Sequence, residues 1–358
     1  MPVPPRRRPM LSVVAPAWNE EAVLPTFHDA LMRVLTTVQD EFDTEIVYVD
    51  DGSDDATPVI LGQLATDDVT MRGARSASEV SASSLACASG STNIRFIRLS
   101  RNFGHQAALT AGLEHARGDV VISMDADLQH PPAVIRELLA RWREGYEVVV
   151  TLRRDHRSLG IFKRLTSRLF YFAMRNMSGM DIRPSAADFR LLSRKSLDAL
   201  LKMPERHRFL RGMVHWLGLP TAEVTFTAPP RFAGKSKFTL VRMVRLARDG
   251  LLSFSRVPLH AALLMAGAML LTSLIGATTA WIFCRPESPV SWLILTLIVG
   301  GHLAGGAVWI ALVAFSEYLA RIHEQVLGRP LYVIETTSDS LAAASTPLGR
   351  NTRSAVAA

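Results

Sequence analysis

The C-terminal third of the chain contains two long runs without a charged side chain. The first covers Val257–Phe283 and the second covers residues 290–315, and neither contains Asp, Glu, Lys or Arg. Crossing a bilayer takes about 20 apolar residues, whereas a long helix in a soluble core normally shows a polar face. Only residues 284–289 join the two runs. The pattern therefore predicts a helical hairpin that crosses a membrane twice.

Basic residues are distributed unevenly around this hairpin. Those before it are Lys235, Lys237, Arg242, Arg245, Arg248 and Arg256, those after it are Arg321 and Arg329, and the short loop contains Arg285. Cytoplasmic loops carry an excess of Lys and Arg. The count predicts a multi-pass protein of the cytoplasmic (inner) membrane, with the long N-terminal part facing the cytoplasm.

Residues 231–256 combine a basic loop with an amphipathic pattern. At helical spacing, residues 238–255 place Leu, Met and Phe on one face and Arg on the other. Such a helix lies in the membrane interface, attracted to anionic headgroups. The alternative is an ordinary amphipathic helix docked on a soluble domain. The position directly before a membrane span favours the interface.

Strands and helices alternate along residues 11–230. Five runs predict strands, namely LSVVAPA, EIVYVD, IRFIRLS, DVVISMDAD and YEVVVTLR, and helical spacing covers residues 21–38, 106–115 and 132–144. This alternation predicts an α/β domain with a mainly parallel, Rossmann-like sheet. Such sheets bind ligands at the carboxyl ends of their strands.

Three segments lack a clear apolar face. Residues 66–93 are rich in Ser and Ala and predict a flexible insertion inside the domain. Residues 1–10 are basic and proline-rich, which predicts disorder. Residues 316–358 are expected to be a cytoplasmic segment that ends in a flexible tail from about Ser338. We expect neither the insertion nor the tail from about Ser338 to carry chemistry.

Composition narrows the classes of partner. The net charge is +7, which suits anionic partners such as a nucleotide, a phosphate or an acidic lipid surface. The basic residues cluster beside the membrane segments without a recognition motif, so a nucleic-acid partner is not expected. Two Cys residues give no disulfide framework or zinc site. No P-loop motif and no run typical of a secretion signal are present.

The stretch VVISMDADLQHPP places Asp125 and Asp127 at the end of a predicted buried strand. Residues i and i+2 of a strand point the same way, so we expect both carboxylates to converge. Two ionised carboxylates at close range need a cation, and oxygen ligands suit Mg²⁺ or Mn²⁺. With Gln129 nearby, we predict a metal–phosphate site. The alternative is a solvated turn whose acids cap the helix that Pro131 and Pro132 open.

A second acidic cluster, VDDGSDDAT, follows the second predicted strand. A carboxylate in this place can accept hydrogen bonds from a base or a ribose. We expect Asp50 and Asp51 to bind ligand. We expect Ser53, Asp54 and Asp55 to cap the next helix.

These features belong to a longer set of motifs: VVAPAWNEE, VYVDDGSDDAT, LSRNFGHQAALTAGLEHARGDVVISMDADLQHPP, ADFRLLSR, FLRGMVHWLG, RFAGKSKF and DGLLSFSRVPL. In this order, and with a two-helix hairpin, the set resembles the family-2 glycosyltransferases with a GT-A fold. More narrowly, it is similar to the polyprenyl-phosphate glycosyltransferases, a group that includes dolichyl-phosphate mannose synthase and bacterial undecaprenyl-phosphate glucosyltransferases. The resemblance covers roughly residues 11–334, apart from the insertion.

The resemblance implies a nucleotide-sugar site. Its residues would be Pro16, Ala17, Asn19, Glu20, Asp50, Asp51, Asp125, Gln129 and Arg153, of which Arg153 would meet phosphate, with Arg154 and Arg157 as alternatives. Asp125 and Asp127, with Gln129 assisting, would hold the metal that bridges the diphosphate. His130 stands where many relatives have an acid.

The resemblance also implies an acceptor site. Its cations would be Arg208, Arg211, Arg231, Lys235 and Lys237, which would surround a lipid phosphate. Asp127, Asp188 and Arg211 would be the catalytic residues, with Asp188 either orienting the acceptor or acting as a base. An ion pair between Asp188 and Arg190 is the alternative for that carboxylate. Ala187 stands where a glycine is more usual.

The implied reaction is metal-dependent transfer of a sugar from a nucleotide-sugar to a polyprenyl (undecaprenyl) phosphate, by single displacement with inversion. Positive charge must stabilise the leaving diphosphate, while the acceptor phosphate is already anionic. UDP-glucose is the first choice of donor, and GDP-mannose and a UDP-aminosugar are alternatives. Assembly of several copies through the membrane part is a further possibility that the resemblance raises.

Two other functions remain open at this stage. A processive membrane polysaccharide synthase typically carries a Gln-x-x-Arg-Trp motif and more spans, and the sequence has neither. A non-catalytic membrane module that binds nucleotide-sugar is the other, and the intact Asp125, Asp127 and Lys235 argue against it.

Overall fold

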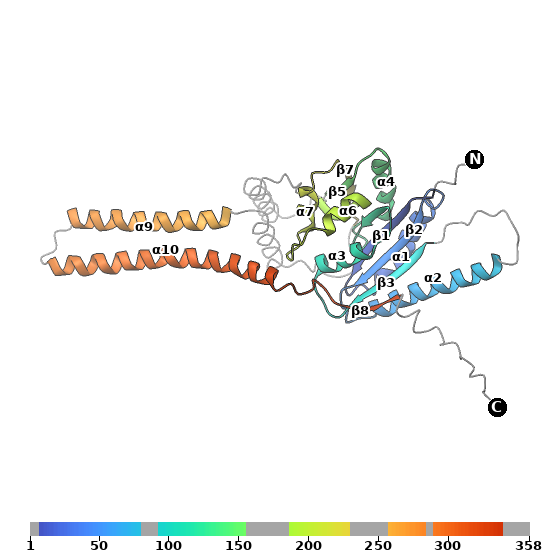
Figure 1. The fold of residues 1–358 in the computed structure, drawn as a ribbon, viewed down its shortest axis with the longest axis horizontal. Helices are drawn as coiled ribbons and strands as arrows, with labels where there is room; N and C mark the ends of the chain where they lie inside the picture. Colours follow the sequence, from blue (N-terminus) through green and yellow to red (C-terminus); the bar gives the residue numbers. More distant parts are fainter. Residues whose placement is uncertain (1–6, 80–91, 155–185, 230–256, 284–288, 339–358) are drawn as a thin grey trace, which may run out of the picture.

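A computed structural model describes residues 7–79, 92–154, 186–229, 257–283 and 289–338 of the chain. It has an α/β domain at one end and a pair of long helices that extends away from it (Figure 1). The juxtamembrane residues 231–256 lie outside the described part. The interfacial helix expected there stays a prediction.

The α/β domain is built on an eight-stranded sheet with the order β7-β5-β6-β4-β1-β2-β3-β8. Its strands are β1 Met10–Ala17, β2 Asp43–Asp50, β3 Asn93–Leu99, β4 Val120–Ser123, β5 Val148–Arg154, β6 Ala186–Ser193, β7 Thr221–Thr227 and β8 Ile334–Thr337. The pairs β1–β2, β1–β4, β2–β3 and β5–β7 are parallel, and β6 and β8 run antiparallel to their neighbours. The predicted α/β class with a mainly parallel sheet is confirmed.

Helices cover both faces of the sheet (Figure 1). One face packs on α1 Leu24–Thr36, α2 Thr57–Glu79 and α4 Ile135–Arg143, which follows a 3₁₀ turn at Pro132–Val134. The other face packs on α3 His105–His115, α6 Arg194–Leu201 and α7 Leu210–Trp216. Every residue of β1 after Met10 is buried, which explains why this strand reads as a continuous apolar run rather than as an alternating one.

Three expectations about the elements are corrected. The fourth strand ends at Ser123, so Asp125 and Asp127 lie on the following turn rather than in the strand. The predicted insertion at 66–93 is not irregular throughout, since α2 continues to Glu79. This part of the segment contains Ala, Met and Arg, which have good helix propensity. The C-terminal segment, in which no strand was expected, contains β8, which pairs with β3.

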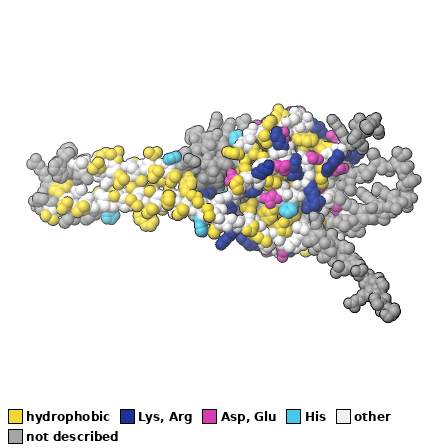
Figure 2. Space-filling view, viewed as in Figure 1, with side chains coloured by type: hydrophobic (Ala, Val, Ile, Leu, Met, Phe, Trp, Pro, Cys, Tyr) yellow, Lys and Arg dark blue, Asp and Glu magenta, His cyan; other side chains and the backbone are white. Residues whose placement is uncertain are grey.

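The predicted hairpin consists of two helices, α9 Val257–Phe283 and α10 Pro289–Val326. By length and composition both could cross a membrane, and only 11% and 6% of their most apolar windows are buried. Figure 2 shows hydrophobic side chains over the visible length of this pair. Such a large exposed apolar surface is typical of a segment that meets lipid or another protein.

Gly112 allows α3 to approach the sheet closely. A Cβ at this position would lie 2.3 Å from Val14 Cγ1 and 3.0 Å from Val49 Cγ2. These valines belong to β1 and β2, so the fit determines how α3 sits across the two strands. His105 is the first residue of the same helix, and its position therefore depends on this contact.

We expect Gly112→Ala to destabilise the protein by about 1–3 kcal/mol because the added methyl group overpacks the core. The matched control is Gly62→Ala on α2, where a Cβ would have nothing within 4 Å and where Ala favours the helix by about 1 kcal/mol. Thermal unfolding in detergent should give a lower Tm for the first variant and an equal or higher Tm for the second. An unchanged Tm for Gly112→Ala would contradict the close packing of α3.

Candidate active site

The loops after β1 and β2 are tied together at the carboxyl edge of the sheet. The Asn19 backbone N–H donates to Ser53 Oγ at 2.9 Å, and Asn19 Oδ1 accepts from the Asp54 N–H at 3.0 Å. Asn19 has a φ of 53°, which Asn tolerates better than most residues. The Glu20 N–H donates to Thr57 Oγ1 at 2.9 Å. The predicted pocket residues after β1 thus face the second acidic cluster.

Pro16 and Ala17 are the last two residues of β1, and both are buried. The Ala17 carbonyl accepts from the Asp51 N–H at 3.0 Å. The end of β1 is thus hydrogen-bonded to the residue that directly follows β2.

Asp50 and Asp51 are both buried, but they face different neighbours. Asp50 Oδ1 accepts from the Ser53 N–H at 3.1 Å, and Asp50 Oδ2 lies 3.5 Å from Arg98 Nε. Asp51 accepts from the backbone N–H groups of Phe103 and Gly104 at 2.7 and 3.0 Å. Burial raises the pKa of both carboxyl groups, that of Asp51 to about 6. Asp51 therefore holds the start of α3 in place, a structural role beyond the ligand role predicted for it.

Asp55 matches its predicted role as a cap. Its carboxylate accepts from the Thr57 N–H at 2.9 Å and from the Glu21 N–H at 3.3 Å. Burial acts to raise the pKa of Asp55, but the hydrogen bonds from Thr57 and Glu21 together outweigh it and hold that pKa below its ordinary value. Asp55 thus stabilises the start of α2 and joins it to the β1 loop.

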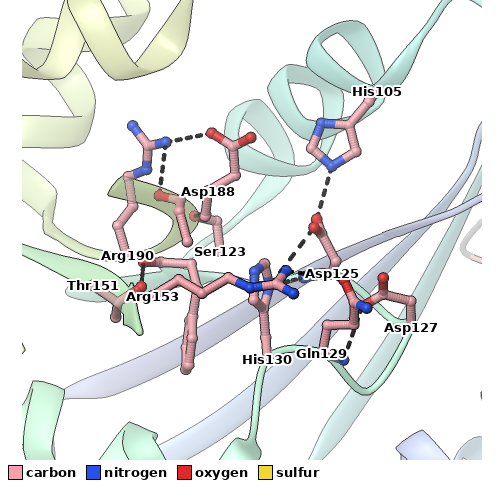
Figure 3. A network of polar contacts seen from close by, with 12 residues as sticks. His105, Ser123, Asp125, Asp127, Gln129, His130, Thr151, Arg153, Asp188 and Arg190 are labelled. Atoms are coloured by element: carbon pink, nitrogen blue, oxygen red, sulfur yellow. Dashed lines mark hydrogen bonds and ion pairs between the residues drawn. The ribbon is translucent and has the colours of Figure 1, made fainter. Parts of the chain in front are cut away.

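Asp125 lies between two histidines (Figure 3). Its Oδ1 is 2.8 Å from His105 Nε2, and its backbone N–H donates to His130 Nδ1 at 2.9 Å. His130 is buried and stacks on Phe189, with ring centroids 5.3 Å apart. The direction of the Asp125 carboxylate is therefore set by these contacts.

Asp127 and Gln129 occupy the turn that follows. Asp127 Oδ1 accepts from the Gln129 N–H at 3.0 Å, and Leu128 between them has a φ of 61°. Arg153, near the end of β5, donates from Nη1 to Gln129 Oε1 at 3.1 Å. Figure 3 shows Asp125, Gln129 and Arg153 gathered on one side of the turn. Because β4 ends at Ser123 and the turn orients the two acids, strand alternation, from which their convergence was predicted, does not apply to them.

Asp188 on β6 is paired with two arginines. Arg211 on α7 donates to both carboxylate oxygens, at 3.1 and 2.9 Å, and Arg190 donates to Oδ1 at 2.5 Å. Such a fork-to-fork pair is among the strongest polar contacts in proteins. The Asp188 carbonyl accepts from Ser123 Oγ at 2.7 Å, which ties this group to the end of β4.

Opposite charges decide the ionisation of this cluster. Burial alone would raise the pKa of Asp188, but Arg211 and Arg190 outweigh it and hold that pKa well below its ordinary value. Burial opposes the charge of Asp125 as well, yet His105 and His130 lower its pKa to about 2. In turn Asp125 overcomes the burial of His105 and raises its pKa to about 9. Both carboxylates are therefore ionised at neutral pH.

Of the five cations predicted to bind a lipid phosphate, only Arg208 and Arg211 lie in the described part of the chain. Arg211 joins the site through Asp188, as described. Arg208 donates to the carbonyls of Met203 and Glu205, both at 3.3 Å, and its side chain is only 10% exposed. These contacts give it a role in holding its own loop. Arg231, Lys235 and Lys237 lie outside the described residues.

The sequence patterns did not assign a role in this site to three residues. His105 and His130 bracket Asp125, and Arg190 faces Asp188. Arg190 entered only as the partner in an alternative for Asp188. His105 was detectable, because the first residue of a helix that follows a parallel strand lies at the same carboxyl edge as the acids.

The oxygen donors of the turn fit a hard divalent cation. Asp125 and Asp127 offer carboxylates, and Gln129 offers an amide oxygen that Arg153 already shares. Mg²⁺ keeps several positions for water and phosphate when one or two carboxylates bind it. Within the described ranges, no group of three or more His, Cys, Asp and Glu side chains is placed to hold a metal. If the turn binds a divalent ion, water and phosphate oxygens would have to complete its coordination.

Comparison with known proteins gives a consistent result. The family described as "Glycosyl transferase family 2" matches residues 12–201. The chain is 33% identical over 329 residues to an "Uncharacterized glycosyltransferase YkcC" of Bacillus subtilis (strain 168), covering 90% of this chain and 93% of that protein. It is 32% identical over 329 residues to the "Bactoprenol glucosyl transferase" of Shigella phage SfII, covering 91% and 97%.

Among solved structures, the chain is similar to glucosyl-3-phosphoglycerate synthase from Mycobacterium tuberculosis, crystallised with Mn²⁺, UDP-glucose and phosphoglyceric acid. The identity is 20%, the TM-score is 0.41, and the match covers 68% of this chain and 79% of that one. The sequence matches extend over most of the chain and include both the sheet edge with its acids and the apolar helices. On this basis the chain belongs to glycosyl transferase family 2, as its motifs predicted.

Proposed function

We propose that the protein transfers a sugar from a nucleotide-sugar to a polyprenyl phosphate at the cytoplasmic face of a membrane, with UDP-glucose as the first choice of donor and undecaprenyl phosphate as the acceptor. The observation that carries the proposal is the match at 32% identity, over 97% of its length, to a relative named for bactoprenol and glucosyl transfer. The two apolar helices support a membrane-embedded acceptor.

The donor would bind across the ends of β1, β2 and β4. Asp50, at the end of β2, would accept a hydrogen bond from the base or the ribose. Arg153, beside Gln129, would meet the diphosphate. Asp125, Asp127 and Gln129 would hold Mg²⁺ or Mn²⁺, and the ion would supply positive charge to the departing diphosphate.

The acceptor would approach Arg211 and Asp188. A carboxylate whose pKa is held well below its ordinary value accepts a proton poorly at neutral pH. We therefore assign Asp188 the role of holding Arg211, whose guanidinium would attract the lipid phosphate. A phosphate that is already anionic can attack the anomeric carbon without a strong base, and a single displacement would invert the configuration.

The first test is a panel of radiolabelled nucleotide-sugars incubated with membranes and undecaprenyl phosphate. We expect lipid-soluble label from one donor, its disappearance with EDTA, and its return when Mg²⁺ or Mn²⁺ is restored. Label that persists in EDTA would contradict the metal assignment. Absence of lipid-linked label from every donor would contradict the acceptor.

The second test concerns the paired acids. We expect Asp125→Asn and Asp127→Asn to lower the rate of transfer at least about 100-fold, because the diphosphate loses its electrostatic stabilisation. The control is Asp29→Asn on the exposed side of α1, which should keep the wild-type rate. Wild-type rates for both site variants, measured by lipid-linked label, would refute the assignment.

The third test separates a positioning role of Asp188 from a role as base. We expect Asp188→Asn and Arg211→Lys each to lower the rate by about 10- to 100-fold through misplacement of the guanidinium. The dependence of kcat on pH between 6 and 9 should keep the wild-type shape in Asp188→Asn. If the wild-type rate rises with pH and that rise is lost in the variant, Asp188 is the base after all.

A further inference from the structure

The helix α10 is longer than a membrane crossing requires. Its 38 residues would measure about 57 Å at 1.5 Å per residue, whereas the hydrocarbon core of a bilayer is about 30 Å thick. The last eleven residues, SEYLARIHEQV, are mostly polar or charged. Figure 1 shows this end of α10 reaching the α/β domain near α3 and β8. The end of the second apolar helix is therefore part of the domain surface.

The end of α10 holds the loop that precedes α7. Gln325 Nε2 donates to the Pro204 carbonyl at 2.6 Å, and Gln325 Oε1 accepts from the Arg206 N–H at 3.0 Å. Next to it, Glu324 Oε2 lies 2.7 Å from His207 Nε2. One amide side chain thus satisfies a donor and an acceptor of the same loop, which fixes the orientation of the loop as well as its distance from the helix.

The helix also has a defined stop. The N–H of Leu327 donates to the His323 carbonyl at 3.0 Å, and Gly328 adopts a φ of 58°. A glycine in this conformation is the usual end of a helix. Arg206 donates through its guanidinium to the Arg329 carbonyl. The chain that follows α10 is therefore held by the same loop, at residues 204–207.

A second attachment follows directly. Tyr332 donates to Glu114 Oε2 on α3 at 2.5 Å, and β8 pairs with β3. Glu335 on β8 lies 3.2 Å from Arg98, the residue that also faces Asp50. The end of α10 is therefore joined to the loop at residues 204–207, and the chain that follows it is joined to α3 and β3.

We propose that Gln325, with Glu324, is a positioning residue that fixes the α/β domain on the end of the membrane helix and so sets the distance of Arg211 from the bilayer surface. Arg211 lies on α7, the helix directly after the clamped loop. A polyprenyl phosphate cannot leave the bilayer, so its phosphate meets the site only if the site is held at the correct height. The inference rests on the proposed function, because it concerns delivery of that acceptor.

The test compares two acceptors in the full-length protein reconstituted in vesicles. The variant is Glu324→Ala/Gln325→Ala, and the control is His323→Ala, an exposed position on the same turn. We expect kcat/KM for undecaprenyl phosphate in the bilayer to fall about tenfold in the variant, since small misplacements are costly. For a water-soluble two-isoprene phosphate, kcat/KM should change less than about twofold, because that acceptor diffuses to the site.

Two kinetic outcomes overturn the inference. An unchanged rate with undecaprenyl phosphate shows that the clamp does not govern delivery. Equal losses with both acceptors show local damage to the site instead. Affinity for the nucleotide-sugar should remain at the wild-type level in the variant and in the control.

One readout does not depend on the reaction. A fluorophore attached to Val59→Cys, an exposed position on α2, in a protein whose Cys87 and Cys284 are replaced by Ser, reports the distance to acceptor dyes on lipid headgroups. Energy transfer should change in Glu324→Ala/Gln325→Ala and stay constant in His323→Ala, and an unchanged signal in both overturns the inference. If wild type transfers sugar to neither phosphate, the proposed function fails, while this measurement still decides whether the clamp positions the domain.

Discussion

A carboxylate buried at the edge of a sheet is stable only when a donor or a cation faces it, because the loss of hydration costs several kcal/mol. This constraint orders the carboxyl end of the sheet. Asp51 faces two backbone N–H groups, the half-buried Asp125 faces His105, and Asp188 faces Arg190 and Arg211. Apart from Asp188–Arg190, which lies within β6, each pairing joins two different elements. The loops of the site are thus held together by the neutralisation of their own acids.

The neutralising groups differ between the two sides of the site. On the β4 turn, Asp125 faces His105, whose raised pKa keeps it protonated at neutral pH, whereas Asp127 accepts from the Gln129 backbone N–H. Of the two acids, Asp127 therefore has the less compensated charge. A divalent ion with a diphosphate would complete the balance on that side. On the β6 side, Asp188 meets two full positive charges. That surplus of positive charge is suited to a second anion.

Sequence patterns predict this architecture well where an element shows one regular spacing of its apolar residues. The buried strands β1 to β5 and the helices α1, α3 and α4 follow from runs and spacings of one kind, and the family motifs identify the acids. The patterns fail where contacts between distant parts of the chain determine the local structure. β8 is a four-residue strand, too short for a signal of its own. The turn after β4 bends because Leu128 is left-handed, which nothing in the run of apolar residues indicates. His105 becomes part of the site only because α3 starts beside Asp125.

The same reasoning explains why the two helices at the C-terminus are more than an anchor. With a mobile tether, the distance of the site from the bilayer would vary. Each encounter with a lipid phosphate would then carry an entropic cost for orienting the domain. The chain instead continues α10 past its apolar part, stops it at Gly328 and returns as β8 to the edge of the sheet that supports Asp50. Under the proposed function, a donor site at the sheet edge and the apolar helices would be parts of one framework. The bilayer would then set the position of the acceptor, and the sheet would set the position of the donor.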